Sequence, residues 1–185
     1  PYNGSRHPAR SHGRAMTWVY RHVVTKIKPK YFAFLDHDLI PIKPISLAKK
    51  LEESGQFCYG TPNKAKGMPY WHLWAGYCVF VYDEVKDKPL NFSYDFSRGL
   101  DTGGRNWPVL YQSLEFNAQK FACDKEVLLR LSDDKKEEFV QVIDDAWFHI
   151  GGISYNNNFQ KKEAIVRAIE SELSAGLQWD DIIKT

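Results

Sequence analysis

The sequence lacks any apolar run long enough to cross a bilayer, and it has few cysteines and little net charge. Its 185 residues are 43% hydrophobic and 26% charged, and a spanning helix would need a run of about 20 mostly apolar residues. The first thirty residues hold basic residues and prolines but no apolar core of a secretory signal. We therefore expect a soluble, cytoplasmic protein with no transmembrane segment.

The cysteine spacing and the net charge argue against two further kinds of protein, those with a cysteine metal site and those that bind nucleic acid. The three cysteines, Cys58, Cys78 and Cys123, lack the spacing of a metal site and lie beside aromatic or apolar residues. We expect them to be buried free thiols. A net charge of +2 offers no bulk attraction to phosphate backbones, so we expect no nucleic-acid partner.

Basic residues nevertheless gather near the start of the chain. They are Arg6, His7, Arg10, His12, Arg14, Arg21 and His22. Such a cluster is typical of a site for a local anionic ligand, and equally of a solvated helix face. The sequence leaves both interpretations open.

Hydrophobic periodicity and turn residues predict an alternation of helices and strands. Helices are expected over 9–28, 45–54, 105–120 and 160–175, and strands over 30–35, 56–60 and 73–82. Residues 61–72 are expected to form a loop. The order predicts an α/β fold with a mixed, partly parallel sheet flanked by helices. We expect a single domain over 1–185.

The first predicted strand, which we expect to be buried, ends in Asp36-His37-Asp38. In open α/β sheets, ligands bind beyond the carboxyl ends of strands. Two carboxylates at this point can converge on Mg²⁺ or Mn²⁺, which keep open positions for phosphate oxygens. The same carboxylates could instead form a turn before Pro41.

A helix followed by an apolar strand that ends in D-x-D resembles the nucleotide-diphospho-sugar glycosyltransferases of the GT-A fold, particularly their family-2-like branch. By this resemblance Asp36 contacts the nucleotide, and Asp38 binds the cation that bridges the donor's diphosphate; Asp36 also contributes to the metal site. The family's opening βαβ unit has no counterpart before residue 9. We expect a truncated or reduced member with weak donor binding.

The same resemblance assigns roles to flanking residues. The stretch NGSRHPARSHGRA is similar to the family's polar loop and helix start, which places Arg6, Arg10 and Arg14 near phosphate. The stretch WAGYCVFVY resembles the strand in which a glycine, here Gly76, lies near the sugar.

Two downstream stretches resemble the rest of a catalytic site. In LDTGG, Asp101 matches the general base, although it could equally be a helix N-cap. In AWFHIGG, His149 is similar to a histidine that returns to the cation and would favour Mn²⁺; a core histidine is the alternative. Asp144 and Asp145 form a second candidate acidic pair.

Aromatic residues of the predicted loop complete the expected site. Tyr70, Trp71, His72 and Trp74 could stack on an acceptor sugar or pack in the core. The resemblance implies metal-dependent transfer of a sugar from a nucleotide-diphosphate donor to a hydroxyl of a carbohydrate or glycan acceptor, with inversion. A metal-dependent nucleotidyltransferase or phosphohydrolase and a non-catalytic binding module are the alternatives.

Overall fold

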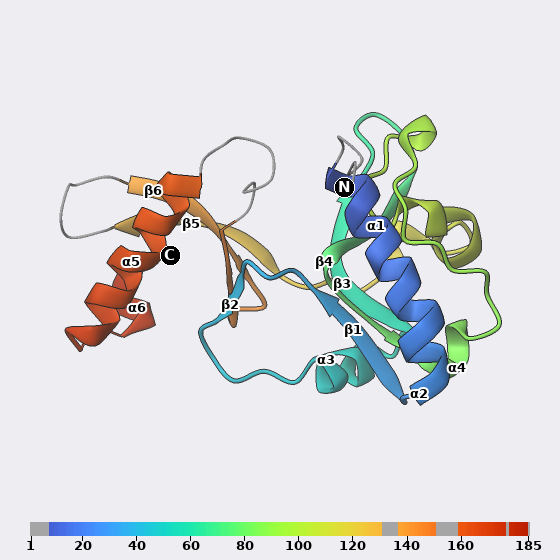
Figure 1. Ribbon diagram of the computed structural model, residues 1–185, viewed down its shortest axis with the longest axis horizontal. Coiled ribbons are helices and arrows are strands. Elements are labelled where there is room, and N and C mark those ends of the chain that lie inside the picture. Colours follow the sequence, from blue (N-terminus) through green and yellow to red (C-terminus); the bar gives the residue numbers. More distant parts are fainter. Residues whose placement is uncertain (1–7, 131–136, 151–158, 177, 185) are drawn as a thin grey trace, which may run out of the picture. The chain divides into compact units, whose positions relative to one another are not determined.

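The computed structural model describes residues 8–130, 137–150, 159–176 and 178–184 and divides into two compact units (Figure 1). Unit 1 comprises Pro1–Asp36 and Ser46–Ala122, and unit 2 comprises His37–Ile45 and Cys123–Thr185. The boundary thus runs through the D-H-D motif, between Asp36 and His37. The single domain over 1–185 stays a prediction.

Unit 1 begins with a nearly continuous helix. Its elements are α1 (Pro8–Val19), the π-helical η1 (Tyr20–Val24) and α2 (Thr25–Ile27). Met16, Tyr20 and Val24 are buried, and their spacing of four places them on one helix face. The helix ends at Lys28, which has a left-handed conformation with φ 51°. The prediction of a helix over 9–28 is confirmed.

The sheet of unit 1 has three strands in the order β1-β4-β3. They are β1 (Tyr31–Leu35), β3 (Cys58–Lys64) and β4 (Trp71–Val81). Both pairs are antiparallel, so the expectation of partly parallel pairing is wrong for this sheet. Because β1 is an edge strand, only its Phe32 is buried while Leu35 is 42% exposed. The prediction of a buried first strand is therefore also wrong.

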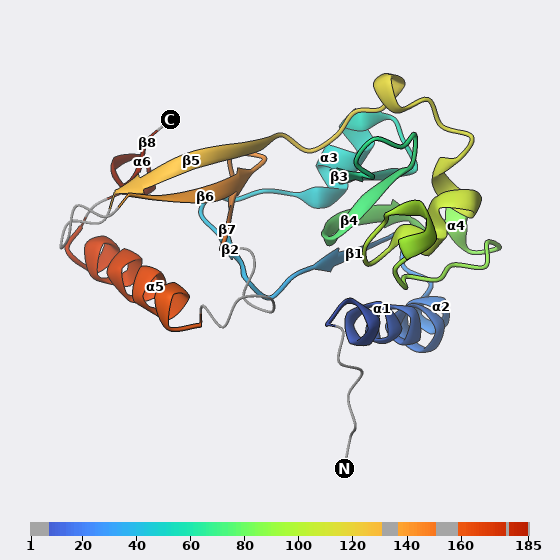
Figure 2. The ribbon, with the colours of Figure 1, turned by 90° about the horizontal axis from the view of Figure 1, so that it is seen from above.

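Helices pack on both faces of this sheet (Figure 2). Phe32 stacks on Phe80 with ring centroids 5.2 Å apart, and Tyr20 lies 5.5 Å from Phe32. Tyr31 points to the opposite face, where its hydroxyl donates to Glu52 of α3 (Leu47–Ser54) at 2.5 Å. The Ser46 side chain caps α3, as the predicted helix over 45–54 requires.

The rest of unit 1 contains short elements. They are α4 (Tyr82–Val85), η2 (Phe96–Arg98), η3 (Gly104–Asn106), η4 (Trp107–Tyr111) and η5 (Phe116–Ala118). The predicted α-helix over 105–120 is thus replaced by 3-10 and π turns, since Pro108 lacks a backbone N–H and prolines suit only helix starts. The predicted loop shrinks to 65–70, because β3 continues to Lys64 across an irregularity between Gly60 and Pro62.

Unit 2 contains a second antiparallel sheet in the order β2-β7-β6-β5-β8. Its strands are β2 (Leu39–Pro41), β5 (Asp124–Arg130), β6 (Glu137–Ile143), β7 (Trp147–His149) and β8 (Ile183–Lys184). Its helices are α5 (Phe159–Ser174) and α6 (Trp179–Ile182). Ile165 and Ile169 of α5 pack with Phe148, which confirms the predicted amphipathic helix over 160–175. The chain is a mixed α/β protein with two antiparallel sheets.

The cysteines do not share one environment. Cys58 and Cys78 are buried; burial raises the pKa of Cys58 to about 12 and also raises the pKa of Cys78. Cys123 is exposed, so the expectation of three buried thiols is wrong there. In the part of the chain that the structure describes, no helix combines the length and apolar character needed to span a bilayer.

Candidate functional site

The structure brings Asp38 and His149 together within unit 2. Strand β2 pairs with β7 so that Leu39 lies opposite His149, and the Ile150 amide continues this pairing by donating to the Asp38 carbonyl at 3.4 Å. The Asp38 carboxylate thereby reaches the imidazole, with 3.6 Å between Oδ1 and Nε2. Both side chains are only 12% exposed. Two residues far apart in the sequence thus form one buried polar pair.

Gln141 holds the other nitrogen of this imidazole. It lies opposite His149 in the pairing of β6 with β7, and its Oε1 contacts His149 Nδ1. An amide oxygen only accepts, so Nδ1 donates, and Nε2 faces the Asp38 carboxylate. This is the arrangement in which an outer hydrogen bond orients a metal-binding histidine.

The pair suits a divalent cation. Asp38 Oδ1 is buried and forms no hydrogen bond with any residue that the structure describes. Two donor atoms bound at about 2.1 Å to one ion lie about 3.0 to 3.5 Å apart, close to the observed separation. Among the described residues no group of three or more acidic, histidine or cysteine side chains could hold a metal. The remaining positions of such an ion would fall to water or phosphate oxygens.

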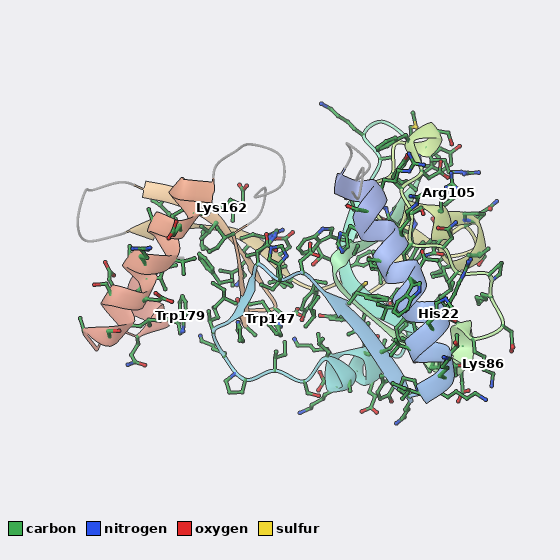
Figure 3. The ribbon with its side chains drawn as sticks, viewed as in Figure 1. His22, Lys86, Arg105, Trp147, Lys162 and Trp179 are labelled. Carbon is green, nitrogen blue, oxygen red and sulfur yellow. The ribbon has the colours of Figure 1, made fainter. Side chains whose placement is uncertain are left out.

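Lys162 adds a positive charge beside this pair. It comes from α5 (Figure 3) and its Nζ donates to the Ile150 carbonyl. Partial burial lowers the pKa of Lys162, and the Asp38 carboxylate opposes that shift. A cation and an ammonium group in one place together favour a ligand with more than one negative charge.

Asp144 and Asp145, the second candidate pair, form the turn between β6 and β7. Both have positive φ, 53° and 54°, and the Ala146 amide donates to the Ile143 carbonyl at 3.0 Å, as in a type I′ turn. Asp144 Oδ1 accepts from the Cys123 amide at 3.0 Å, and Asp145 pairs with Lys125 at 2.8 Å. These bonds give both carboxylates structural roles.

Asp36 belongs to unit 1 and contacts the predicted sugar-side glycine. Its amide donates to the Gly76 carbonyl at 2.9 Å, which extends the β1–β4 pairing by one residue. Its carboxylate lies 3.4 Å from His12 Nε2 of α1. Asp36 is thus fixed at the end of the edge strand with an imidazole beside it.

The predicted phosphate-binding arginines do not share the position of His12. Arg10 and Arg14 are exposed, and each lies two residues from His12, about 200° around the helix. The structure therefore places His12 against Asp36 and turns Arg10 and Arg14 away from it. Arg6 lies outside the described residues.

Gly76 is explained by close packing. A Cβ atom at this position would lie 2.2 Å from the ring of Trp74, which is half-buried. The indole therefore covers the glycine next to the Asp36 contact. Trp74 stays a candidate for acceptor binding.

Trp71 is a core residue rather than an acceptor platform. It is 2% exposed and is surrounded by aromatic rings with centroids at 4.9 to 6.4 Å, those of Trp107, Tyr111, Phe116 and Phe121. No ring face is left for a sugar, so its expected acceptor role is withdrawn. Tyr70 is half-buried, with the Arg98 guanidinium 5.8 Å from its ring centroid, and keeps that role as a prediction.

Asp101 is exposed and lies next to a buried histidine. Its Oδ1 accepts from the Thr102 amide at 2.7 Å, while the N-cap of η3 is Gly103, with no side-chain cap bond. The capping alternative is therefore wrong. The neighbouring Thr102 carbonyl lies 3.0 Å from His72 Nε2, which joins this turn to the start of β4.

We expect His72 to make the protein less stable in acid. Burial lowers the pKa of His72 from 6.5 to about 4, although the Thr102 hydrogen bond opposes the shift. Below pH 6.5 the imidazole of His72 is protonated in the unfolded chain, whereas in the folded chain it stays neutral down to about pH 4. Stability present above pH 6.5 should therefore fall toward pH 4, by about 3 kcal/mol at most.

Urea unfolding between pH 7.5 and pH 4.5 measures this loss. In His72→Gln the side-chain amide can still donate to the Thr102 carbonyl but does not titrate. The variant should lose less stability over that range than the wild type. Equal pH dependence of the two proteins would contradict the assignment.

Comparisons with known proteins do not identify a family for this chain. No protein-family model matches the chain, and no curated protein or solved structure matches it either.

Three residues of these sites were not predicted. Gln141 lies opposite His149 because three residues, 144–146, separate the paired residues Ile143 and Trp147, and a two-residue turn at 144–145 would instead have placed it opposite Phe148. His12 belongs to the basic cluster, but nothing in the sequence separates it from Arg10 or Arg14. Lys162 reaches Ile150 from another element, and no local pattern marks it.

Proposed function

We propose that the chain is a metal-dependent glycosyltransferase that uses a nucleotide-diphosphate sugar as donor. The observation that carries this proposal is the buried pair of Asp38 and His149, whose oxygen and nitrogen lie 3.6 Å apart. The family resemblance names both residues as ligands of one cation, Asp38 through the D-x-D motif and His149 through the stretch AWFHIGG, with Asp36 contributing to the same site. If the D-x-D motif occurred by chance, nothing would require His149 to lie beside Asp38, so their proximity supports the resemblance.

Asp38 and His149 would hold the cation, with Mn²⁺ favoured by the imidazole nitrogen. When bound, the ion neutralises the negative charge that develops on a diphosphate leaving group. Gln141 orients the imidazole, and Lys162 supplies a further positive charge for the phosphates. Mg²⁺ is the alternative ion.

The resemblance assigns further roles to residues of unit 1. Asp36 binds the nucleotide side, with His12 beside it and Gly76 leaving room for the Trp74 ring. Tyr70 and Trp74 contact a carbohydrate acceptor. Asp101 removes the proton of the acceptor hydroxyl as general base, which implies inversion at the anomeric carbon.

Calorimetric titration with UDP and GDP tests the metal and donor site. We expect nucleoside-diphosphate binding that requires Mn²⁺ or Mg²⁺, and Asp38→Asn should abolish this metal-dependent binding. His149→Ala should weaken Mn²⁺ binding by more than about tenfold, because losing a direct ligand costs at least as much as the 10- to 100-fold seen for outer-shell changes.

Asp145→Asn is the matched control, since this unit 2 carboxylate is exposed and pairs with Lys125. It should leave metal binding unchanged. A simple His149–Asp38 ion pair predicts a different outcome, in which His149→Ala lowers the melting temperature and the wild type binds no Mn²⁺ at millimolar concentration. That result would remove the metal site and the proposal with it.

A further inference from the structure

A hollow in the surface of unit 1 has no part in the proposed reaction. It lies between α1, η1 and the segment 91–93, and has a volume of about 310 Å³. Its lining residues are Arg14, Thr17, Trp18, Arg21, His22, Asn91 and Ser93. This volume is at the lower end of the range for small-molecule sites.

The hollow exists because α1 lies directly on the segment 91–93. A Cβ atom on Gly13 would lie 2.5 Å from the Phe92 carbonyl oxygen, so only glycine permits this approach. One turn later, the Thr17 hydroxyl accepts from the Phe92 amide at 2.9 Å and donates to the Gly13 carbonyl at 2.7 Å. The helix is therefore fixed to the segment.

The floor of the hollow is polar and ordered. The Asn91 amide donates to the side chain of Asn106 at 2.7 Å, and Asn106 is 1% exposed. The Ser93 amide donates to Asn91 Oδ1 at 3.0 Å. Because Asn91 Oδ1 already accepts this bond, the side-chain NH₂ of Asn91 is the group that can donate to a ligand.

The walls are basic and aromatic. Arg14, Trp18 and Arg21 follow one another at intervals of about one helical turn, and His22 comes directly after Arg21. Arg21 and His22 belong to the π-helical η1, where Figure 3 labels His22. Trp18 is 58% exposed, with its ring 4.9 Å from that of His22. Over the described ranges, no carboxylate lines the hollow. Single π turns within helices are frequent at functional sites.

We propose that this hollow binds a mononucleotide, with its phosphate on Arg14 and Arg21 and its base against Trp18. Two guanidinium groups recognise a phosphate through charge-assisted hydrogen bonds, and an exposed indole stacks on a base. The polar floor matches the ribose hydroxyls. The basic cluster near the start of the chain thereby contains an anion site rather than only a solvated face.

The lining of the hollow belongs wholly to unit 1 and includes neither Asp36 nor His12. Arg14 and Trp18 lie about 200° and 240° around α1 from His12, which contacts Asp36. The proposed binding mode uses neither a cation nor Asp38. The inference consequently does not depend on the proposed function.

Calorimetric titration with AMP in the presence of EDTA tests the proposal. The wild type should bind AMP more tightly than inorganic phosphate or adenosine, which are its two halves. Arg14→Gln and Arg21→Gln should each weaken AMP binding by about tenfold, as expected for a lost charge-assisted hydrogen bond. Trp18→Ala should weaken AMP binding about five- to hundredfold and leave phosphate binding unchanged.

Lys26→Gln is the matched control, because it removes one positive charge from the same helical stretch outside the hollow, and it should leave AMP affinity unchanged. Asp38→Asn should also bind AMP normally, even if glycosyltransfer is never found. No AMP binding at millimolar concentration would overturn the proposal. Equal affinity for AMP and phosphate, or tighter binding of a single-stranded oligonucleotide than of AMP, would overturn the assignment to a mononucleotide.

Discussion

Replacing Asp101 with asparagine is expected to lower kcat of sugar transfer by about 10²- to 10⁴-fold, the usual contribution of a general base. Donor KM and nucleoside-diphosphate affinity should change little, because the base acts on the acceptor in the transition state. The local turn should survive. Asparagine keeps a side-chain oxygen that can accept from the Thr102 amide, as Asp101 does at 2.7 Å.

The measurement is release of nucleoside diphosphate from a panel of nucleotide sugars at saturating donor and acceptor, with thermal unfolding of each variant. Asp83→Asn is a suitable control, since this exposed carboxylate only pairs with Lys86 at 2.9 Å. A kcat of Asp101→Asn within about threefold of the wild type would remove Asp101 from the mechanism. Asp144 and Asp145 would not replace it, because the turn and its bonds already engage both carboxylates.

Trp71→Ala is expected to destabilise the protein by about 3–5 kcal/mol. The indole is 2% exposed and lies 4.9 Å from Tyr111 and 5.4 Å from both Phe116 and Phe121, measured between ring centroids. Its removal loses transfer free energy and leaves a cavity that these rings can fill only in part.

Urea unfolding of the wild type and the variant measures this loss. Trp18→Ala deletes the same side chain at a position that is 58% exposed, and should change stability by no more than about 0.5 kcal/mol. A loss below about 1 kcal/mol for Trp71→Ala would show that this ring contributes little to the core, and would return it to the candidates for acceptor binding.

Sequence patterns predicted the elements of unit 1 better than their pairing. The apolar run of β4 and the helix that begins at Pro8 were evident because each has a clear length or period. The antiparallel order was not evident, since β1 pairs with a strand forty residues later and its partner is chosen by packing across the sheet. Nearly every residue of β4 on both faces is buried, with Trp74 and Val81 half-buried, so alternation along the strand could not tell which of its aromatic residues belong to the core.

The candidate site was predicted only where residues carry a recognisable motif. The D-x-D motif named Asp38 and the stretch AWFHIGG named His149, and the β2–β7 register brings the two residues together. Gln141 and Lys162 depend on cross-strand register and on helix packing, which no local pattern records. The boundary between the two units, which separates Asp36 from Asp38, is likewise invisible in a motif that reads as one continuous stretch.

The contact between Asp38 and His149 depends on the length of the turn at Asp144 and Asp145. Side chains of a strand alternate between faces, so a shift of pairing by one residue reverses the face of every side chain on it. Insertion or deletion of a single codon in this turn would slide β7 past β6 and β2. Phe148 or Ile150 would then occupy the place of His149, although every proposed ligand would still be present in the sequence. A reading-frame-preserving change in this turn should therefore remove the proposed cation site although it alters none of the proposed ligands.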